Sequence, residues 1–363
     1  MILLWPSGEP AARTAELGLI SEVHGAVVVE VRKDALCPDT LPEQDLSCPM
    51  VELELLEGPD EGDRVSVGLP RAFSETGLAP GDRVVAGVNP GATEELKYSL
   101  MDRDRGSVLL WLTILFAAAV VVLGGLRGAG AIVGLVASLG VLVVFVLPAI
   151  LDGRSPLLVA IVGASAIAFL ALFVAHGFTT MTAVALMGTL ASLALTGILA
   201  AAFVELSEIT GLATEEAGLV NFGAAQIDIR GLILAGVVLG GLGAIDDMTV
   251  TQASAIWELR AASPQMSNRL LTRAGLRIGR DHVASTVNTL ALAYAGASMP
   301  LLVLFVLSGQ SLGTVANSEV VATEIVRTLV GSIGLVAAVP LTTWLAARCV
   351  PRAAPAPPSS QLP

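Results

Sequence analysis

Two adjacent carboxylates, Asp246 and Asp247, lie inside a long apolar stretch and are the residues whose chemistry most requires an explanation. A charged side chain at the centre of a membrane costs about 2.5–3.5 kcal/mol on insertion scales, so it must pair with a cation, take up a proton or face water. Low dielectric and a like-charged neighbour both favour the protonated form of a carboxyl group. One member of the pair is therefore expected to exchange protons near neutral pH.

The helix that carries this pair is expected to have one small and polar face. With 3.6 residues per turn, Asp247 lies on that face and Asp246 lies about 100° round from it. The other members of the face are Gly240, Gly243, Thr251 and Ser254. Such a face packs closely against a neighbouring helix and presents Asp247 to it.

Hydroxyl and amide side chains in the next apolar stretch supply partners for the pair. Ser285 and Asn288 lie in the part of that stretch that is expected to be on the same side of the membrane as Asp247. We therefore predict a proton relay in which Asp247 is the principal carrier, Asp246 modulates it, and Ser285 and Asn288 hydrogen-bond to it. The alternative is a hydrated pair near the interface that acts only as a structural cap.

The elements that must position these residues are long apolar segments. Apolar residues make up 54% of the 363-residue chain and charged residues 14%, whereas a soluble domain has about 25% charged residues. A helix needs about 20 apolar residues to cross a membrane, and no segment alternates as a membrane β-barrel strand does. The sequence therefore predicts an all-α polytopic membrane domain over residues 106–350. Its seven or so helices are expected at 108–126, 130–151, 157–175, 182–204, 231–253, 284–308 and 328–347.

The charged connections between these helices predict their orientation. The connection 205–230 is acidic, whereas the connection 258–282 is rich in arginine. Positive connections stay in the cytoplasm, so the N-terminal domain is expected outside and the C-terminus inside. Because no Lys or Arg falls within a predicted helix, protonation of the Asp pair is favoured over an ion pair. The arginines expected to contact anionic lipid headgroups are Arg269, Arg273, Arg277 and Arg280.

The first 105 residues are expected to form a separate, acidic and β-rich domain outside the membrane. They hold twenty Asp and Glu against nine Lys and Arg, which argues against a nucleic-acid partner. Strands are predicted at 23–31, 50–56, 64–69 and 83–88, in a small barrel or sandwich. Cys37 and Cys48 are expected to form a disulfide in an oxidising compartment, with two free thiols as the alternative.

The two ends of the chain carry separate expectations. The opening MILLWP resembles the last turn of an apolar segment, so we expect an upstream membrane helix that belongs to the native protein. The alternative is that the first long helix pulls the domain across the membrane. Residues 351–363 are rich in proline and are expected to be disordered.

No other motif predicts a chemical site. His176 is a lone histidine at a helix end and is expected to be structural, and one histidine near the two cysteines does not make a zinc site. Motifs for nucleotide hydrolysis, metalloproteases and serine hydrolases do not occur in the sequence. The sequence therefore predicts neither an enzyme nor a metal or cofactor site.

The order of an acidic domain, a helix array and the segment GAIDDMTVTQASAIWELR resembles the YibE/F family of bacterial membrane proteins. The resemblance extends over nearly the whole chain, and the segment with its arginine-rich continuation is specific. It implies a location in the bacterial cytoplasmic membrane. The family brings no established activity with it.

A weaker and local resemblance concerns the proton-relay helix of RND exporters and of SecD/SecF, in which an aspartate carries the proton. The similar residues are Asp246 and Asp247 followed by Glu258 and Arg260, while the smaller outer domain and the single repeat depart from those families. This resemblance implies a proton-coupled secondary transporter or export factor for an unknown small substrate. The alternative is a non-transporting scaffold whose outer domain binds an envelope protein.

Overall fold

The computed structural model describes residues 1, 4–6, 22–32, 49–70, 73, 77–89, 92–93, 97–223 and 227–351. The chain divides into two compact units, residues 11–118 and residues 1–10 with 119–363. The predicted disulfide between Cys37 and Cys48 lies outside the described residues, and so does the proline-rich tail from residue 352 onward.

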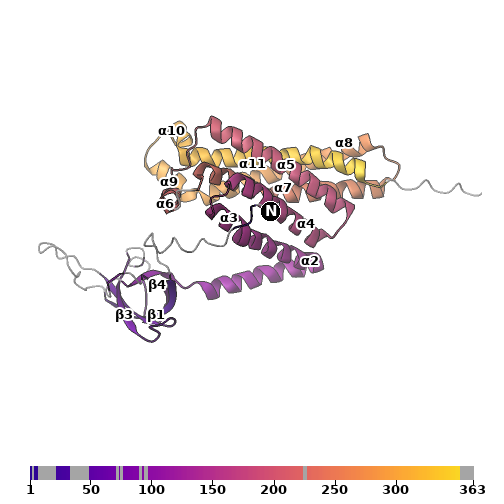
Figure 1. The fold of residues 1–363 in the computed structure, drawn as a ribbon. Helices are drawn as coiled ribbons and strands as arrows, with labels where there is room; N and C mark the ends of the chain where they lie inside the picture. Colours follow the sequence, from indigo (N-terminus) through magenta and orange to yellow (C-terminus); the bar gives the residue numbers. More distant parts are fainter. Residues whose placement is uncertain are drawn as a thin grey trace, which may run out of the picture. The chain divides into compact units, whose positions relative to one another are not determined.

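The described part of the first unit contains one antiparallel sheet of five strands (Figure 1). The strands are β1 (Glu22–Arg32), β2 (Met50–Leu55), β3 (Arg64–Gly68), β4 (Arg83–Val88) and β5 (Tyr98–Arg103). Their order is β3-β2-β1-β4-β5, so the long β1 is central. The edge strands β3 and β5 also contact each other, which curls the sheet into a half-barrel.

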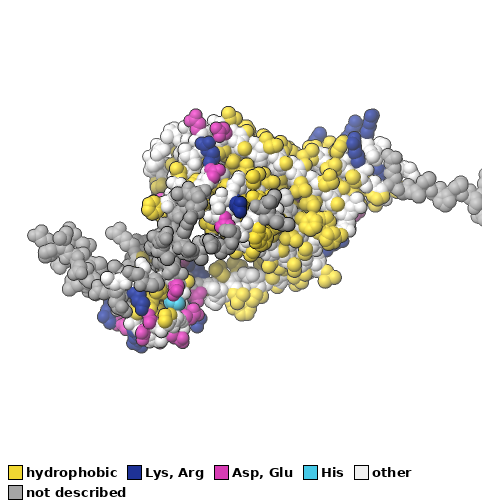
Figure 2. Space-filling view, viewed as in Figure 1, with side chains coloured by type: hydrophobic (Ala, Val, Ile, Leu, Met, Phe, Trp, Pro, Cys, Tyr) yellow, Lys and Arg dark blue, Asp and Glu magenta, His cyan; other side chains and the backbone are white. Residues whose placement is uncertain are grey.

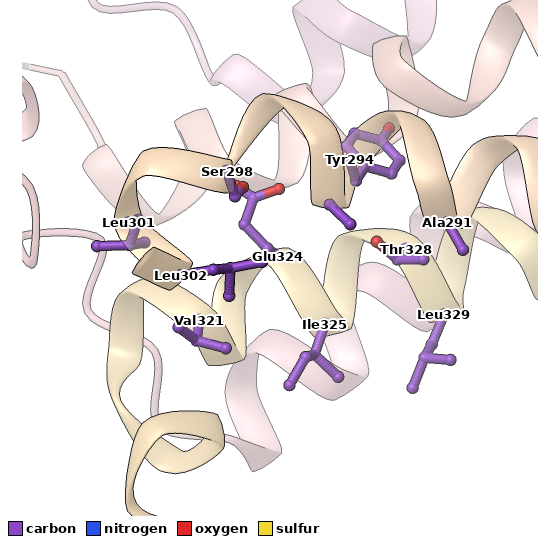
Figure 3. Close-up of a pocket in the computed structure, with 11 residues that line it drawn as sticks. Ala291, Tyr294, Ser298, Leu301, Leu302, Val321, Glu324, Ile325, Thr328 and Leu329 are labelled. Carbon is purple, nitrogen blue, oxygen red and sulfur yellow. The ribbon is translucent and has the colours of Figure 1, made fainter. Parts of the chain in front are cut away.

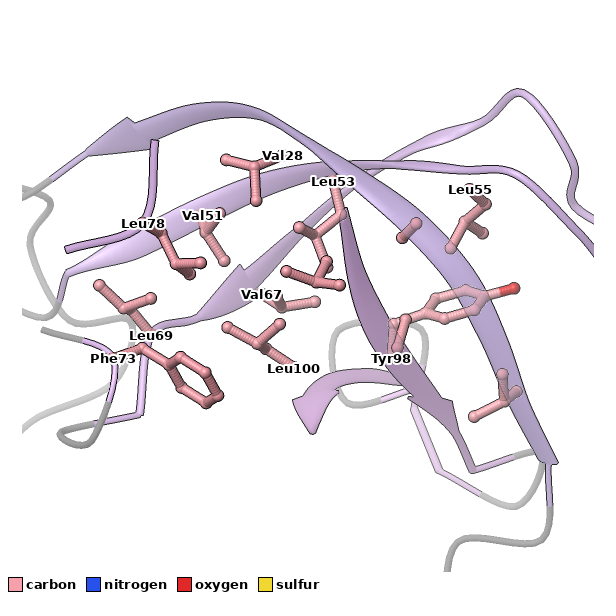
Figure 4. Close-up of a cluster of buried hydrophobic side chains, with 14 residues drawn as sticks. Val28, Val51, Leu53, Leu55, Val67, Leu69, Phe73, Leu78, Tyr98 and Leu100 are labelled. Carbon is pink, nitrogen blue, oxygen red and sulfur yellow. The ribbon is translucent and has the colours of Figure 1, made fainter. Parts of the chain in front are cut away.

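Alternating apolar and polar residues explain why these segments are strands. In β2, Val51, Leu53 and Leu55 are buried, while the residues between them are half-buried. Their side chains meet Val28 of β1 and Leu100 of β5 inside the curl of the sheet (Figure 4). Because each buried side chain of this kind contributes about 1.5–3 kcal/mol, this cluster holds the sheet together.

Four of the five strands confirm the sequence prediction, with ends that agree to within one residue. The sequence does not predict β5, because only Tyr98 and Leu100 of its six residues are buried. A strand with so few buried positions at the edge of a sheet has a weak alternating pattern.

A hydrogen-bond network ties the turn after β2 to the start of β5. The Asp60 carboxylate accepts a hydrogen bond from Lys97 Nζ at 2.6 Å and another from the Tyr98 hydroxyl. These bonds hold the pKa of the Asp60 carboxyl below its usual value. Burial, together with the bond to Asp60, raises the pKa of Tyr98. The ionised form of Asp60 therefore fixes the edge strand.

Long apolar helices make up most of the second unit. They are α4 (Pro156–His176), α5 (Thr180–Leu206), α7 (Ile229–Ala262), α8 (Asn268–Ala297) and α11 (Glu319–Cys349), preceded by α2 (Gly106–Val141), which begins in the first unit. The shorter elements are a π-helical turn (Leu142–Val146), α3 (Leu147–Leu151), α6 (Glu215–Gly223), α9 (Met299–Leu307) and α10 (Leu312–Asn317).

The first long helix, α2, is broken at Gly125, whose φ of 56° and ψ of −137° are not helical. A Cβ on Gly128 would overlap the carbonyl oxygen of Val120, although residues eight apart in a straight helix are separated by about 12 Å along its axis. The chain therefore folds back at Gly125, where glycine permits the positive φ. The break falls near the end of the predicted segment 108–126 and before the predicted segment 130–151, so it separates the two.

Five of the described helices are long and apolar enough to cross a membrane, with 106–151 counted as one. The number rises to six if α8 and α9, which meet at a bend of 64°, form one broken span. Pro300 near the start of α9 cannot continue the hydrogen bonding of α8, which explains the bend. Most of the arginine-rich connection predicted at 258–282 is helical, because only residues 263–267 link α7 to α8.

Helices α5, α7, α8 and α11 lie side by side (Figure 1). α5 runs antiparallel to α7, since Thr189 lies against Thr249 while the later Gly197 faces the earlier Val238. Hydrophobic side chains cover most of the visible face of this unit, and charged side chains gather at its ends (Figure 2). Long helices with an apolar surface of this kind fit a membrane protein.

The Asp60 network predicts how the sheet responds to acid. A carboxyl whose pKa is lowered on folding stabilises the folded state above its unfolded pKa of about 3.9, and this stabilisation is lost as the pH falls through the lower folded pKa. We therefore expect Asp60→Asn to reduce the amide-exchange protection of β5 at neutral pH. The protection that remains should fall less than in the wild type as the pH is lowered. Hydrogen-exchange mass spectrometry of residues 97–103, corrected for intrinsic rates, measures both effects.

The control for this experiment is Asp63→Asn in the same turn, because no hydrogen bond of the Asp63 side chain occurs among the described residues. Equal loss of protection in the two variants would contradict the assignment of this role to Asp60.

Candidate functional site

A line of buried polar side chains runs along the contact between α5, α7 and α11. Each of these hydroxyl or amide side chains belongs to a residue that is at most 8% exposed. Polar groups in such a place normally have hydrogen-bond partners. The set, which we name the polar track, consists of Thr182, Thr189, Ser192, Thr196, Thr249, Gln252, Ser332, Thr342 and Thr343.

Hydrogen bonds within the polar track join α7 to both of its neighbours. The hydroxyls of Thr189 and Thr249 are 2.8 Å apart, and the Thr343 hydroxyl donates to Gln252 Oε1 at 2.8 Å. Thr249 also donates to the carbonyl oxygen of Asp246 at 3.0 Å. In the polar track and at Asp246 beside it, the buried atoms that have no hydrogen-bond partner among the described residues are Ser192 Oγ, Asp246 Oδ1, Gln252 Nε2, Ser332 Oγ and Thr342 Oγ1. All of these atoms can hydrogen-bond to water, and the Asp246 carboxyl can also take up a proton.

Glycines on neighbouring helices allow the polar track to fit between closely packed backbones. A Cβ on Gly188 would overlap Thr342 Oγ1, and a Cβ on Gly334 would overlap Thr196 Oγ1. Each hydroxyl therefore occupies space that any larger residue would fill. Close backbone approach at small residues is the usual way in which helices associate in lipid.

Asp246 is the acidic residue of the contact between α5 and α7. Its side chain lies beside Thr189, and its Oδ1 is buried without a hydrogen-bond partner. No Lys, Arg or His of the described residues forms an ion pair with it. Among hydroxyls and without a cation, a neutral acid is better accommodated than a carboxylate.

Asp247 faces a different helix, α8. Its Oδ2 lies 3.6 Å from Nε2 of His282, and its side chain is 67% exposed. Ser285 and Asn288, the predicted partners, are exposed, and no hydrogen bond described for α8 joins either of them to the Asp pair. His282 takes the place that the sequence analysis assigns to them.

The arginine-rich part of α8 is an exposed helical face. Its opposite side is buried through Leu271, Gly275 and Gly279. The exposed residues of this face include all four predicted headgroup contacts, Arg269, Arg273, Arg277 and Arg280. Arg260 of α7 is only 5% exposed and donates to the carbonyl oxygen of Met266 at 2.6 Å, so it holds the turn between α7 and α8.

A second charged pair lies within α11. Arg327 donates to Glu324 Oε1 at 2.6 Å, and the two side chains are only 25% and 27% exposed. The sequence predicts no cation inside a helix, and for Arg327 the reason is that the last helix is expected to begin at residue 328. That prediction is wrong, since α11 begins at Glu319 and includes Arg327.

His282 and Arg327 are thus site residues that the sequence does not predict, and it does not predict the residues of the polar track either. A signal for His282 exists: Asp247 lies 15 residues before the end of α7, and His282 lies 14 residues after the start of α8. Residues at equal distances from the turn of an antiparallel helix pair lie at the same level. For Arg327 the signal is Ser318, a typical N-cap residue one position before α11.

The glycine contacts predict a specific stability change. Gly334→Ala is expected to destabilise the protein by about 1–3 kcal/mol, as overpacking of a close contact does. Thr196→Ala removes the hydroxyl that the new methyl group meets and should restore most of the lost stability. Unfolding of the purified protein in detergent measures both changes.

Gly296→Ala is the matched control, because no described atom lies within 4 Å of a Cβ at this position of α8. A Gly334→Ala variant as stable as Gly296→Ala would contradict the close contact between α5 and α11.

The helices that carry the polar track and the Asp pair lie within a region that matches a known family. The model of the family described as YibE/F-like protein matches residues 112–352. No curated protein matches the chain. No solved structure matches it either. The family match covers more than half of the sequence, and the chain therefore belongs to the YibE/F-like family.

Proposed function

We propose that this protein is a proton-coupled secondary transporter or export factor of the bacterial cytoplasmic membrane, with Asp246 as its proton carrier. The observation that carries the proposal is the buried and unpartnered Oδ1 of Asp246 beside the polar track. A carboxyl group without a cation in an apolar helix packing is a functional group by default. It takes up a proton when its surroundings exclude water, and it releases the proton when water reaches it.

The geometry supports different roles for the two aspartates from those that the sequence predicts. Asp246 lies against Thr189 of α5, and Asp247 lies against His282 of α8. We assign the occluded proton to Asp246 and the exchange of protons with it to Asp247 and His282. Ser285 and Asn288 are close along α8 and can bind the water that this exchange requires.

The proposed topology has seven crossings. The break at Gly125 divides 106–151 into two of them, and α8 with α9 forms one bent crossing. The N-terminal sheet is then outside and the C-terminus inside. This orientation places the exposed arginines of α8 at the cytoplasmic surface, where anionic lipid headgroups attract them. Nucleic acid, metal ions and organic cofactors have no part in the proposal.

Proton-coupled transport can be tested without knowledge of the substrate. Everted membrane vesicles are acidified by respiration, and fractions of a small-molecule extract are added while a dye reports the internal pH. We expect a substrate-containing fraction to release protons through the wild-type protein. Asp246→Asn should lower this rate by about a hundredfold or more, as removal of a proton-transferring group does.

Glu258→Gln is the control, because Glu258 is an exposed carboxylate on the same helix. Proton release that persists in Asp246→Asn would contradict the assigned carrier. If no fraction releases protons and only deletion of residues 22–103 impairs the cell, the protein is a scaffold whose outer domain binds an envelope protein.

A further inference from the structure

We propose that protons reach the Asp pair from the end of the helical unit at which α7 and α11 begin. They pass through Glu324 and Tyr294 and then along the glycine face of α7. The glycine face consists of Gly236, Gly240 and Gly243. The inference rests on the proposed function, because an occluded carrier requires a route that connects it to water.

Glu324 has the position of a group that receives protons from water. It is partly exposed and paired with Arg327, and it lines two neighbouring cavities. The guanidinium of Arg327 extends to α7, where its Nη2 lies 3.5 Å from the position of a Cβ on Gly236. The buried Nε of Arg327 has no hydrogen-bond partner among the described residues. This charged pair is therefore held against the start of the glycine face.

The route begins at the first cavity, of about 200 Å³, which lies where α7 and α11 begin. Thr214, which lies before α7, and Glu319, at the start of α11, both line it together with Glu324 and Arg327. Connecting segments run over the surface of a protein and are hydrated. Water in this cavity therefore has access to the Glu324 carboxylate.

The second cavity, of about 230 Å³, continues the route between α8, α9 and α11. Its walls are mostly apolar, with Glu324, Tyr294 and Ser298 among the polar residues that line it. Figure 3 shows the Glu324 carboxylate beside Ser298, with the Tyr294 ring further along α8. Tyr294 is near enough to interact electrostatically with both Glu324 and Arg327.

Beyond Tyr294, the glycine face leads to the Asp pair. The Tyr294 hydroxyl lies 2.6 Å from the position of a Cβ on Gly240. At Gly243, no described atom lies within 4 Å of such a position, so the surface of α7 is open there. Gly240 and Asp247 are about 10 Å apart along the helix axis. About three water molecules at a hydrogen-bond spacing of about 2.8 Å span this distance.

The residues of the route have the chemistry that proton transfer requires. Glu324 takes a proton from cavity water and releases Arg327. The Tyr294 hydroxyl accepts the proton and at the same time gives its own proton to water beside Gly243. Asp247 and His282 receive it, and Glu324 re-forms its ion pair as a carboxylate. One proton moves and no other reactant is consumed.

Deuterium exchange at the buried carboxyl group tests the route. The full-length protein in liposomes is transferred to D₂O, and infrared spectroscopy follows the carboxyl band that Asp246→Asn removes. We expect exchange to slow by about tenfold or more in Glu324→Gln and in Tyr294→Phe, which corresponds to a barrier increase of about 1.4 kcal/mol. Tyr294→Phe leaves the ion pair intact, so it tests the route even if Glu324→Gln fails to fold.

Glu258→Gln, at the opposite end of α7, should exchange at the wild-type rate. Wild-type exchange in both Glu324→Gln and Tyr294→Phe would overturn the route and leave Asp246 as the carrier. If Asp246→Asn removes no carboxyl band at all, the proposed function fails, and the route is overturned with it.

Discussion

The close approach of helices at glycine is the interaction on which the helical unit depends. Apolar burial does not drive helices together in lipid, so they associate through backbone contact and hydrogen bonds at small residues. In this protein Gly188 and Gly334 leave room for Thr342 and Thr196 on the facing helix. The same contacts that bring α5 and α11 together therefore also bring hydroxyl groups into the interior.

The position of the Asp pair follows from this packing. α7 lies between α5 and α8, and two successive residues on a helix point about 100° apart. Asp246 consequently meets the hydroxyls of α5, and Asp247 meets His282 of α8. α7 thus presents the Asp246 carboxyl to a buried contact with α5 and the Asp247 carboxyl to an exposed contact with α8. This division allows a single site to hold a proton and to exchange it.

Periodicity and composition predict much of this arrangement. They identify the apolar segments, four strands and the separation of Asp246 from Asp247 on the helix. They do not identify the polar side of α7 that packs in the interior, because Thr249 and Gln252 are buried there, whereas Gly240, Gly243 and Asp247 of the predicted face are exposed. They do not predict β5, whose pattern is weak at the sheet edge. The bend at Pro300 is not predicted either, because the apolar run 284–308 continues through the proline without interruption. Partners such as His282 depend on the register between two helices, and that register is set by contacts distant in the sequence. For the same reason the placement of the Asp pair relative to α5 required the structure.

The central claim is that Asp246 is a neutral carboxyl group that exchanges its proton near physiological pH. Infrared difference spectroscopy across a pH titration tests it most directly, with wild type, Asp246→Asn and Asp247→Asn compared. The account predicts a protonated carboxyl band that titrates near neutral pH, disappears in Asp246→Asn and persists in Asp247→Asn. A pair that stays ionised down to about pH 4, as exposed aspartates do, would contradict it.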